Sequence, residues 1–524
     1  MSEAAARPRD ERFVLAVDLG SSALKIGLVS LTGRIAWWRQ TALQTTHGPG
    51  RAVTQDAHEW WRLVVAGARR GLAESSVAAE QVVAVALTGQ YASTVPVDSE
   101  GRPVAPVMMW MDTRGEPHSR RLIGGRVEGY NARRMLTFIR RTGGGPSPTG
   151  GDPIGHMLHW ERDEPDVAGV TRWYLEPVDY LAMCFTGFPA ASHASMTAAW
   201  LTDNRNPEVL AYDDELTTLA GVDPAKLPPL VATGSLVGKV QPSVASRLGI
   251  SPDVVVVTGI TDVHSAAMGS GCVRDYEAHI GLGTTTWVSA PVPRKKTDVF
   301  RQMAALPGLS PGHYLLVNSQ SASGRSLQWF RDEVAAGFGP GEAWPFDRVT
   351  ELAGTAPAGS GGVIFTPWLA GERGPVDDAR ARGGFHNLSL TTTRAELARS
   401  VLEGAAFNAR WLLEAADHFT GRRLEPLRLF GGGARSDLWC QILADVFDRR
   451  VDRLAEPVLT GLRGCGLWAG TALGAVTREE VRGLVPVDTT FLPNATGRAT
   501  YDRLFAEFPR LYKAQRRMFH RLNG

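Results

Sequence analysis

Residues 13–30, FVLAVDLGSSALKIGLVS, contain two apolar runs separated by a turn of glycine and serine. Such runs are typical of paired β-strands, so the stretch predicts a hairpin with strands at 13–20 and 24–30. Residues 276–292, YEAHIGLGTTTWVSAPV, repeat this order with Leu-Gly followed by threonines. The two turns are about 263 residues apart, half of the 524-residue chain. An internal duplication into two similar lobes is therefore predicted.

The rest of the chain alternates short apolar runs with helical segments of 10–20 residues. This alternation predicts an α/β fold with mixed sheets. A chain of this length needs more than one hydrophobic core, and we place the boundary between an N-terminal lobe, 1–270, and a C-terminal lobe, 271–524. Further strands are expected at 82–90, 253–260 and 427–431, and helices at 55–73, 393–418 and 500–521.

The composition excludes several classes of protein. The 56 Lys and Arg residues balance the 54 Asp and Glu residues, with no block of like charge that would attract nucleic acid or a membrane surface. The first residues lack the apolar core of a signal peptide, and no window approaches 18 consecutive apolar residues. We therefore predict a cytoplasmic protein without a membrane span. Its four cysteines form no CxxC pair and are predicted to be reduced thiols.

The two turns have the chemistry of phosphate-binding loops. Backbone N–H groups and hydroxyls of Gly20, Ser21 and Ser22, and of Gly283, Thr284 and Thr285, could cradle a polyphosphate, although each turn alone could be merely a tight hairpin turn. Their matching places in two lobes favour the phosphate interpretation. Asp18, at the end of the first strand, could hold Mg²⁺ directly or through water.

Lysine is scarce in this chain, and Lys25 is the only lysine among the first 225 residues. Its place five residues after Gly20 would let it neutralise a β- or γ-phosphate. Chance survival of a single lysine is the alternative.

Other nucleotide-binding motifs fit poorly. No GxxxxGK[ST] occurs, which excludes a P-loop enzyme. Gly431–Ser436 follows a strand but ends in serine where the dinucleotide fingerprint has glycine or alanine. Gly464-Cys465-Gly466 follows a loop and is interpreted as a helix-packing run. A dinucleotide-dependent oxidoreductase is disfavoured.

Nine motifs in order resemble those of the FGGY carbohydrate kinases, and the xylulokinase-like branch more than glycerol kinase. The motifs are DLGSSALK (18–25), LTGQ (87–90), WMDTR (110–114), GITDVHSAAMGSG (259–271), GLGTTT (281–286), SGRSLQWFRD (323–332), PWLAGERGP (367–375), GGFHNLSLTTTRAELARSVLEG (383–404) and FGGGARSDLW (430–439). The resemblance implies an RNase H-like, actin-like fold with duplicated lobes and a central cleft.

The resemblance also implies site residues. The two turns and Lys25 would hold the phosphates of ATP, and the adenosine would be framed by Gly324, Gln328, Gly432, Gly433 and Asp437. Asp262 falls where the family has its catalytic base; phosphoryl transfer needs one carboxylate to accept the proton of the attacking hydroxyl. An ordinary helix N-cap is the alternative for Asp262, and His264 is expected to be structural.

Three departures from the family pattern fall at Tyr91-Ala92, where xylulokinases have Met-His, at Val263, where relatives have Asn or Gln, and at Met157, where Lys is expected. The first two departures fall at sugar contacts and spare the ATP machinery. The loss of hydrogen-bond partners at a sugar contact changes substrate selectivity. Asn387 stands where glycine is usual, a place where Asn can adopt the same left-handed backbone. The candidate substrate contacts are Gln90, Tyr91, Trp110, Asp112 and Asp262.

The main hypothesis is an ATP- and Mg²⁺-dependent kinase of a small carbohydrate, a xylulose-like ketose or related polyol. One alternative is a catalytically degenerate protein that senses sugar or nucleotide on the same fold, since a fold does not fix a function. Another is a chaperone or filament ATPase, which would hydrolyse ATP without sugar. Dimers are common in the family, so the resemblance also implies a homodimer.

Overall fold

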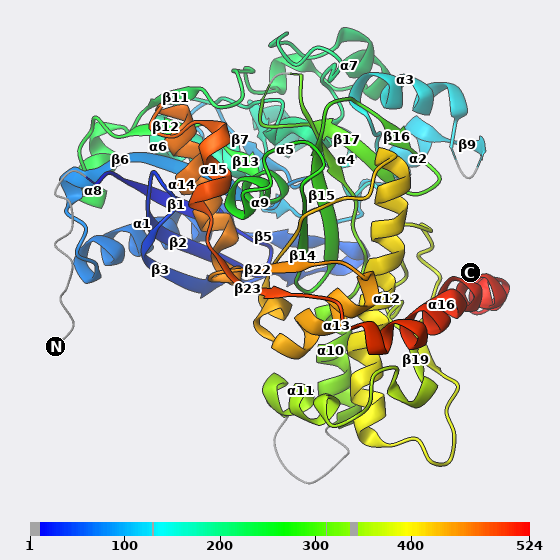
Figure 1. Cartoon of the computed structure of the whole chain (residues 1–524). Helices are drawn as coiled ribbons and strands as arrows, with labels where there is room; N and C mark the ends of the chain where they lie inside the picture. The colour runs from blue at the N-terminus through cyan, green and yellow to red at the C-terminus, as the bar shows by residue number, and fades with distance from the viewer. Residues whose placement is uncertain (1–10, 128–129, 311, 336–343, 524) are drawn as a thin grey trace, which may run out of the picture.

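The computed structural model describes residues 11–523 except 128–129, 311 and 336–343. Two large mixed sheets dominate it (Figure 1). The N-terminal sheet has the order β11-β12-β6-β1-β2-β3, with β13 also pairing with β6. Its strands are β1 (Phe13–Leu19), β2 (Ala23–Ser30), β3 (Ile35–Ala42), β6 (Val82–Gly89), β11 (Leu236–Lys239), β12 (Val255–Val257) and β13 (Ile260–Thr261).

The C-terminal sheet has the order β16-β17-β18-β15-β14-β21-β22-β23. In both sheets an antiparallel hairpin is followed by two parallel strands, β6 and β12 beside β1–β2, and β21 and β22 beside β14–β15. This shared topology is the duplication that the sequence predicts. The strands are β14 (Ala278–Leu282), β15 (Thr286–Val292), β16 (Thr297–Asp298), β17 (Met303–Pro307), β18 (Tyr314–Val317), β21 (Leu427–Phe430), β22 (Val451–Leu454) and β23 (Val487–Phe491).

Helices cover both sheets, and their starts follow local capping rules. Asp56 caps α1 (Ala57–Glu74), Thr393 and Glu396 form a capping box at the start of α12 (Arg394–Thr420), and Ser436 caps α13 (Asp437–Phe447). The last helix, α16 (Ala495–Leu522), begins five residues before the predicted start because Asn494 caps it. The others are α2 (Glu116–Ile123), α3 (Ala132–Thr142), α4 (Pro153–Asp163), α5 (Pro165–Val170), α6 (Pro177–Thr186), α7 (Asp214–Ala220), α8 (Pro242–Leu248), α9 (Asp262–Ser270), α10 (Gly324–Trp329), α11 (Phe346–Gly354), α14 (Thr460–Ala472) and α15 (Arg478–Leu484).

The strand expected at 253–260 is shorter than predicted. It is divided into β12 and β13 by Thr258 and Gly259, and β13 leads directly into α9. Smaller two- and three-stranded ladders lie outside the large sheets and consist of β4 (Thr46–His47), β5 (Val53–Gln55), β7 (Val95–Val97), β8 (Val107–Met108), β10 (Trp173–Leu175), β19 (Ile364–Thr366) and β20 (Gly384–His386); β9 (Gly124–Val127) is a further short strand.

One helix crosses between the halves of the sequence. α14, drawn in orange in Figure 1, packs against β1, β2 and β6 of the N-terminal sheet. Its Leu462, Cys465 and Trp468 share a buried apolar cluster with Val14 and Val29. The boundary between the lobes at residue 270 stays a prediction. α14 follows this boundary in the sequence but packs on the sheet that precedes it.

The cysteine and membrane predictions can be compared with the described residues. All four cysteines are free. Among the described helices, none is long and apolar enough to cross a membrane.

Candidate active site

A large cleft of about 3250 Å³ lies where the turns of the two hairpins approach each other. Residues of the β1–β2 turn and of the β14–β15 turn both line it. All but one of the site residues predicted from the sequence line this cleft: Asp18, Gly20, Ser21, Ser22, Lys25, Gln90, Tyr91, Trp110, Asp262, Gly283, Thr284, Thr285, Gly324, Gln328, Gly432, Gly433 and Asp437.

Asp18 and Lys25 face each other across the first hairpin. They are opposite residues of the β1–β2 ladder, and Lys25 Nζ lies 3.0 Å from Asp18 Oδ2. The Asp18 carboxylate raises the pKa of Lys25 and outweighs the opposing effect of burial. Lys25 therefore stays protonated beside the Gly20–Ser22 turn, in an ion pair with Asp18.

Asp262 is the first residue of α9, and Thr261 occupies the N-cap position. Its side chain is accessible to water in the cleft, but the surrounding protein separates it from bulk solvent. Loss of bulk water and the nearby Asp18 carboxylate raise the pKa of Asp262 to about 7, against the opposing effects of the Val263 N–H and Lys25. A carboxyl group with this pKa can change its protonation state near neutral pH.

The second turn is joined to the start of α10. Gly324 N donates to the carbonyl oxygen of Gly283 at 2.9 Å, and Ser323 N donates to that of Thr284 at 3.0 Å. A Cβ atom at residue 324 would lie 2.5 Å from the Gly283 oxygen, so this close approach requires glycine. The loop of Gly283–Thr285 and the predicted adenosine residue Gly324 thus form one wall segment.

The remaining predicted adenosine residues lie on the same lobe. Gly432 is open, with no atom within 4 Å of an added Cβ, whereas Gly433 packs against Leu282. Gln328 is exposed to the cleft, and Asp437 forms an ion pair with Arg453.

Ser21, Gln90 and Trp110 form one hydrogen-bonded group. Ser21 Oγ donates to Gln90 Oε1 at 3.1 Å and accepts from Trp110 Nε1 at 3.0 Å. The Arg373 guanidinium, which belongs to the GERGP loop, lies 5.2 Å from the centre of the Trp110 ring. The predicted phosphate turn and the predicted sugar contacts are therefore mechanically linked.

Asp112 is the predicted residue that does not line the cleft. It is fully buried, and its carboxylate accepts hydrogen bonds from Val53 N at 3.0 Å and Arg114 Nη2 at 2.9 Å. These contacts fix the loop that follows Trp110. A direct contact of Asp112 with sugar stays a prediction without geometric support.

The two departures near the sugar contacts touch a common apolar cluster. Tyr91 packs with Val263 and Leu315, and the next residue, Ala92, has a left-handed backbone with φ 59°. Burial and the neighbouring Asp262 charge raise the pKa of Tyr91, so its hydroxyl stays protonated. Asn387 likewise adopts the left-handed backbone expected of it, with φ 63°.

The sequence interpretation missed the start of α14 as part of the site. A Cβ atom on Gly461 would lie 2.6 Å from Asp18 Oδ2, so the helix approaches the carboxylate closely only because residue 461 is glycine. Further along, a Cβ on Gly464 would lie 2.0 Å from the carbonyl oxygen of Ser265 in α9. Gly464 therefore packs on another helix, as interpreted from the sequence, whereas Gly466 packs on strand β2, where an added Cβ would lie 2.7 Å from the Ser30 carbonyl oxygen. The spacing of Gly464 and Gly466 is visible in the sequence, but the elements against which these glycines pack are not.

His264 is structural, as expected. It is buried, with Nδ1 2.7 Å from Thr261 Oγ1 and Nε2 2.8 Å from the Pro307 carbonyl oxygen. These bonds fix the start of α9 and hence the position of Asp262.

Comparisons with known proteins identify the family of the chain. Models of the FGGY family of carbohydrate kinases match the chain over residues 13–269 for the N-terminal domain and 278–473 for the C-terminal domain. Xylulose kinase of Staphylococcus epidermidis is 28% identical over 508 residues, covering 96% of this chain and 97% of the relative. Xylulose kinase of Streptomyces rubiginosus is 30% identical over 481 residues, covering 90% and 92%.

A solved structure shows the same fold. Ligand-bound xylulose kinase from Lactobacillus acidophilus has a TM-score of 0.84 at 21% identity, covering 98% of this chain and 100% of that one. The duplicated lobes and the cleft define a protein of the actin-like ATPase fold. The chain belongs to the FGGY family of carbohydrate kinases, and it is an ATP-dependent carbohydrate kinase. The predicted fold class, family and enzyme class are confirmed.

Proposed function

We propose that this kinase phosphorylates a xylulose-like ketose or a related polyol, with Asp262 as the catalytic base. The observation that carries the proposal is the placement of Asp262 at the start of α9, open to the cleft and with its pKa raised to about 7. The names of the relatives, xylulose kinases over almost the whole chain, support the substrate class.

In the reaction, Asp262 accepts the proton of a substrate hydroxyl while the hydroxyl oxygen attacks the γ-phosphorus of ATP. The bond from the γ-phosphorus to the bridging oxygen breaks, and ADP leaves. Lys25 and the N–H groups of both turns stabilise the negative charge of the phosphates. Gly324, Gln328, Gly432, Gly433 and Asp437 frame the adenosine.

The residues of the cleft fit a Mg²⁺ ion. Asp18 and Asp262 present two carboxylates close enough that Asp18 raises the pKa of Asp262, and a divalent cation would relieve this repulsion. Mg²⁺ prefers one or two carboxylates together with phosphate oxygens. Asp18 would hold the ion, which would neutralise charge on the transferred phosphoryl group. A homodimer and a cytoplasmic location remain predictions from the sequence.

A substrate screen tests the proposal. The full chain is incubated with ATP, Mg²⁺ and pentuloses, pentitols, tetritols or glycerol, and ADP release is measured. We expect one sugar or polyol to stimulate release, and Asp262→Asn to lower kcat by about 10²–10⁴-fold. Asp253→Asn, an exposed carboxylate paired with Lys239, is the matched control. Full activity of the Asp262 variant, or binding of sugar and ATP without any product, contradicts the proposal.

The apolar cluster of Tyr91 and Val263 should set substrate preference. Val263→Asn adds hydrogen-bonding groups beside Asp262, where the family pattern has Asn or Gln. We expect it to alter the ratio of kcat/KM between two sugars by about tenfold or more, with the KM for ATP unchanged. An unchanged ratio would remove Val263 from the specificity determinants.

A further inference from the structure

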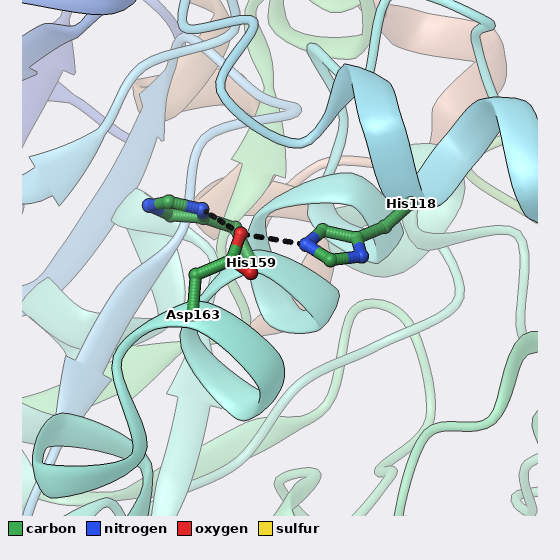
Figure 2. A group of neighbouring side chains, drawn as sticks. All are labelled: His118, His159 and Asp163. Atoms are coloured by element: carbon green, nitrogen blue, oxygen red, sulfur yellow. Dashed lines mark hydrogen bonds and ion pairs between the residues drawn. The ribbon is translucent and has the colours of Figure 1, made fainter.

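A cluster of two histidines and a carboxylate lies outside the residues that line the cleft. His159 and Asp163 are four residues apart on α4, and His118 reaches them from α2 (Figure 2). His118 Nε2 lies 2.6 Å and His159 Nδ1 lies 2.9 Å from the same oxygen, Asp163 Oδ2. Figure 2 shows this carboxylate between the two imidazole rings.

We propose that His118, His159 and Asp163 bind a transition-metal ion of the Zn²⁺ class. One ligand atom from each residue lies within 4.8 Å of the others. Metal–ligand bonds of about 2.0–2.2 Å place tetrahedral ligand atoms about 3.3–3.5 Å apart, so a small rotation of the Asp163 side chain would admit the ion. Two imidazole nitrogens and one carboxylate oxygen favour Zn²⁺ or Co²⁺ over Mg²⁺, which prefers oxygen ligands.

The surroundings of His159 support coordination through Nδ1. Its other ring nitrogen, Nε2, lies 3.1 Å from Glu164 Oε1. Metal-bound histidines commonly donate their second N–H to a carboxylate, which orients the ring and raises its basicity. Glu164 is therefore placed to accept the Nε2–H, while Nδ1 faces Asp163, the second proposed ligand.

The burial pattern suits a site with an open coordination position. The His118 side chain is 5% exposed, whereas the Asp163 side chain is 44% exposed. The ion would therefore be held on its buried side by His118 and would be accessible to water on the side of Asp163. Three protein ligands and one water are the usual set of an open Zn²⁺ site. The nearby Arg114 has its Nη1 3.5 Å from Glu164 Oε1 and its Nη2 2.9 Å from Asp112 Oδ2, so its positive charge is already shared between two carboxylates.

Metal binding would join α2 to the end of α4. Glu164 follows α4 directly, and through Arg114 and Asp112 it contacts the loop that carries Trp110. The site is separate from the ATP and sugar residues, so its occupancy can be measured without either substrate.

Isothermal titration of the tag-free, chelator-treated full chain with Zn²⁺, in the absence of ATP and sugar, tests the proposal. We expect saturable binding of one ion per chain, and a Co²⁺ absorption spectrum typical of four-coordinate geometry. Asp163→Asn keeps an acceptor for the histidines but should abolish this binding, as should His159→Gln. Glu164→Gln should weaken it by about 10–100-fold.

His58→Gln is the matched control, because His58 is exposed on α1 and outside the cluster. It should bind Zn²⁺ like the unchanged chain, and circular dichroism verifies that each variant is folded. Absence of saturable binding in the unchanged chain, or equal affinity in a folded Asp163→Asn, overturns the proposal and leaves the cluster as a hydrogen-bonded link between two helices.

Discussion

The pH dependence of turnover offers the most direct test of the roles of Asp262 and Lys25. Asp262 must be ionised to accept a proton, and its pKa is raised to about 7. The ionised fraction of such a group falls from about one half at pH 7 to about 1% at pH 5, so the rate at limiting ATP and sugar, which reports the free enzyme, should fall roughly 50-fold over this interval.

Lys25→Met should move this acid limb to higher pH. Lys25 favours the ionised form of Asp262, and it also pairs with Asp18, whose charge disfavours that form. Removing the cation therefore raises the pKa of Asp262 in two ways: the favourable Lys25 charge is lost, and the Asp18 charge is no longer compensated. We expect the acid limb to move by about 0.5–1 pH unit, equivalent to about 0.7–1.4 kcal/mol. The displacement is independent of the loss of turnover that follows from a missing phosphate ligand.

The assay is ADP release between pH 5 and pH 9, with folding verified at each pH. Lys239→Met is the matched control, because Lys239 pairs with Asp253 on the surface and does not line the cleft. An acid limb at the same pH in Lys25→Met, or one that persists in the residual activity of Asp262→Asn, would refute the reasoning.

Three further predictions concern stability and close packing. Because the pKa of Asp262 is raised in the folded state, ionisation destabilises the substrate-free protein as the pH rises above about 4. Thermal melts should thus show that Asp262→Asn raises the free energy of unfolding by about 1–2 kcal/mol at pH 8 relative to the unchanged protein, and that this gain shrinks toward pH 4. The figure is lower than the full pKa shift would give, because water in the cleft screens the Asp262 charge. Gly461→Ala would press a Cβ against Asp18 Oδ2 and should lower kcat by about tenfold or more, whereas Gly483→Ala, with no atom within 4 Å of its Cβ, should leave kcat unchanged. Gly269→Ala would place a Cβ 1.9 Å from the Thr460 carbonyl oxygen, and urea titration should show a loss of about 1–3 kcal/mol in the free energy of unfolding; no loss would mean that α9 and α14 separate at little cost.

Features determined by neighbouring residues could be predicted from the sequence. Both hairpins, the capping box of Thr393 and Glu396 and the cap at Ser436 depend on residues within a few positions of one another. The duplication was predictable because the two turns recur with the same order of residue types. The placement of the two turns on one cleft then followed from the resemblance to a known fold.

Features that depend on distant partners could not be predicted in this way. Asp112 looked like a sugar contact, but its carboxylate is occupied by Arg114 and Val53, and the sequence carries no signal for the latter. The spacing of His159 and Asp163 is visible on one helix, whereas His118 joins them only because α2 packs on α4. Such contacts are set by tertiary packing.

The packing of α14 has a consequence for folding during synthesis. Val14 and Val29 lie on a face of the first sheet that is buried by Leu462 and Trp468, residues made more than 400 positions later. Ribosomes add about 5–20 residues per second, so this apolar face would await its cover for roughly 20–90 seconds. The N-terminal lobe therefore depends on the C-terminal half to complete its core, and a nascent chain stalled before residue 460 would expose an aggregation-prone surface.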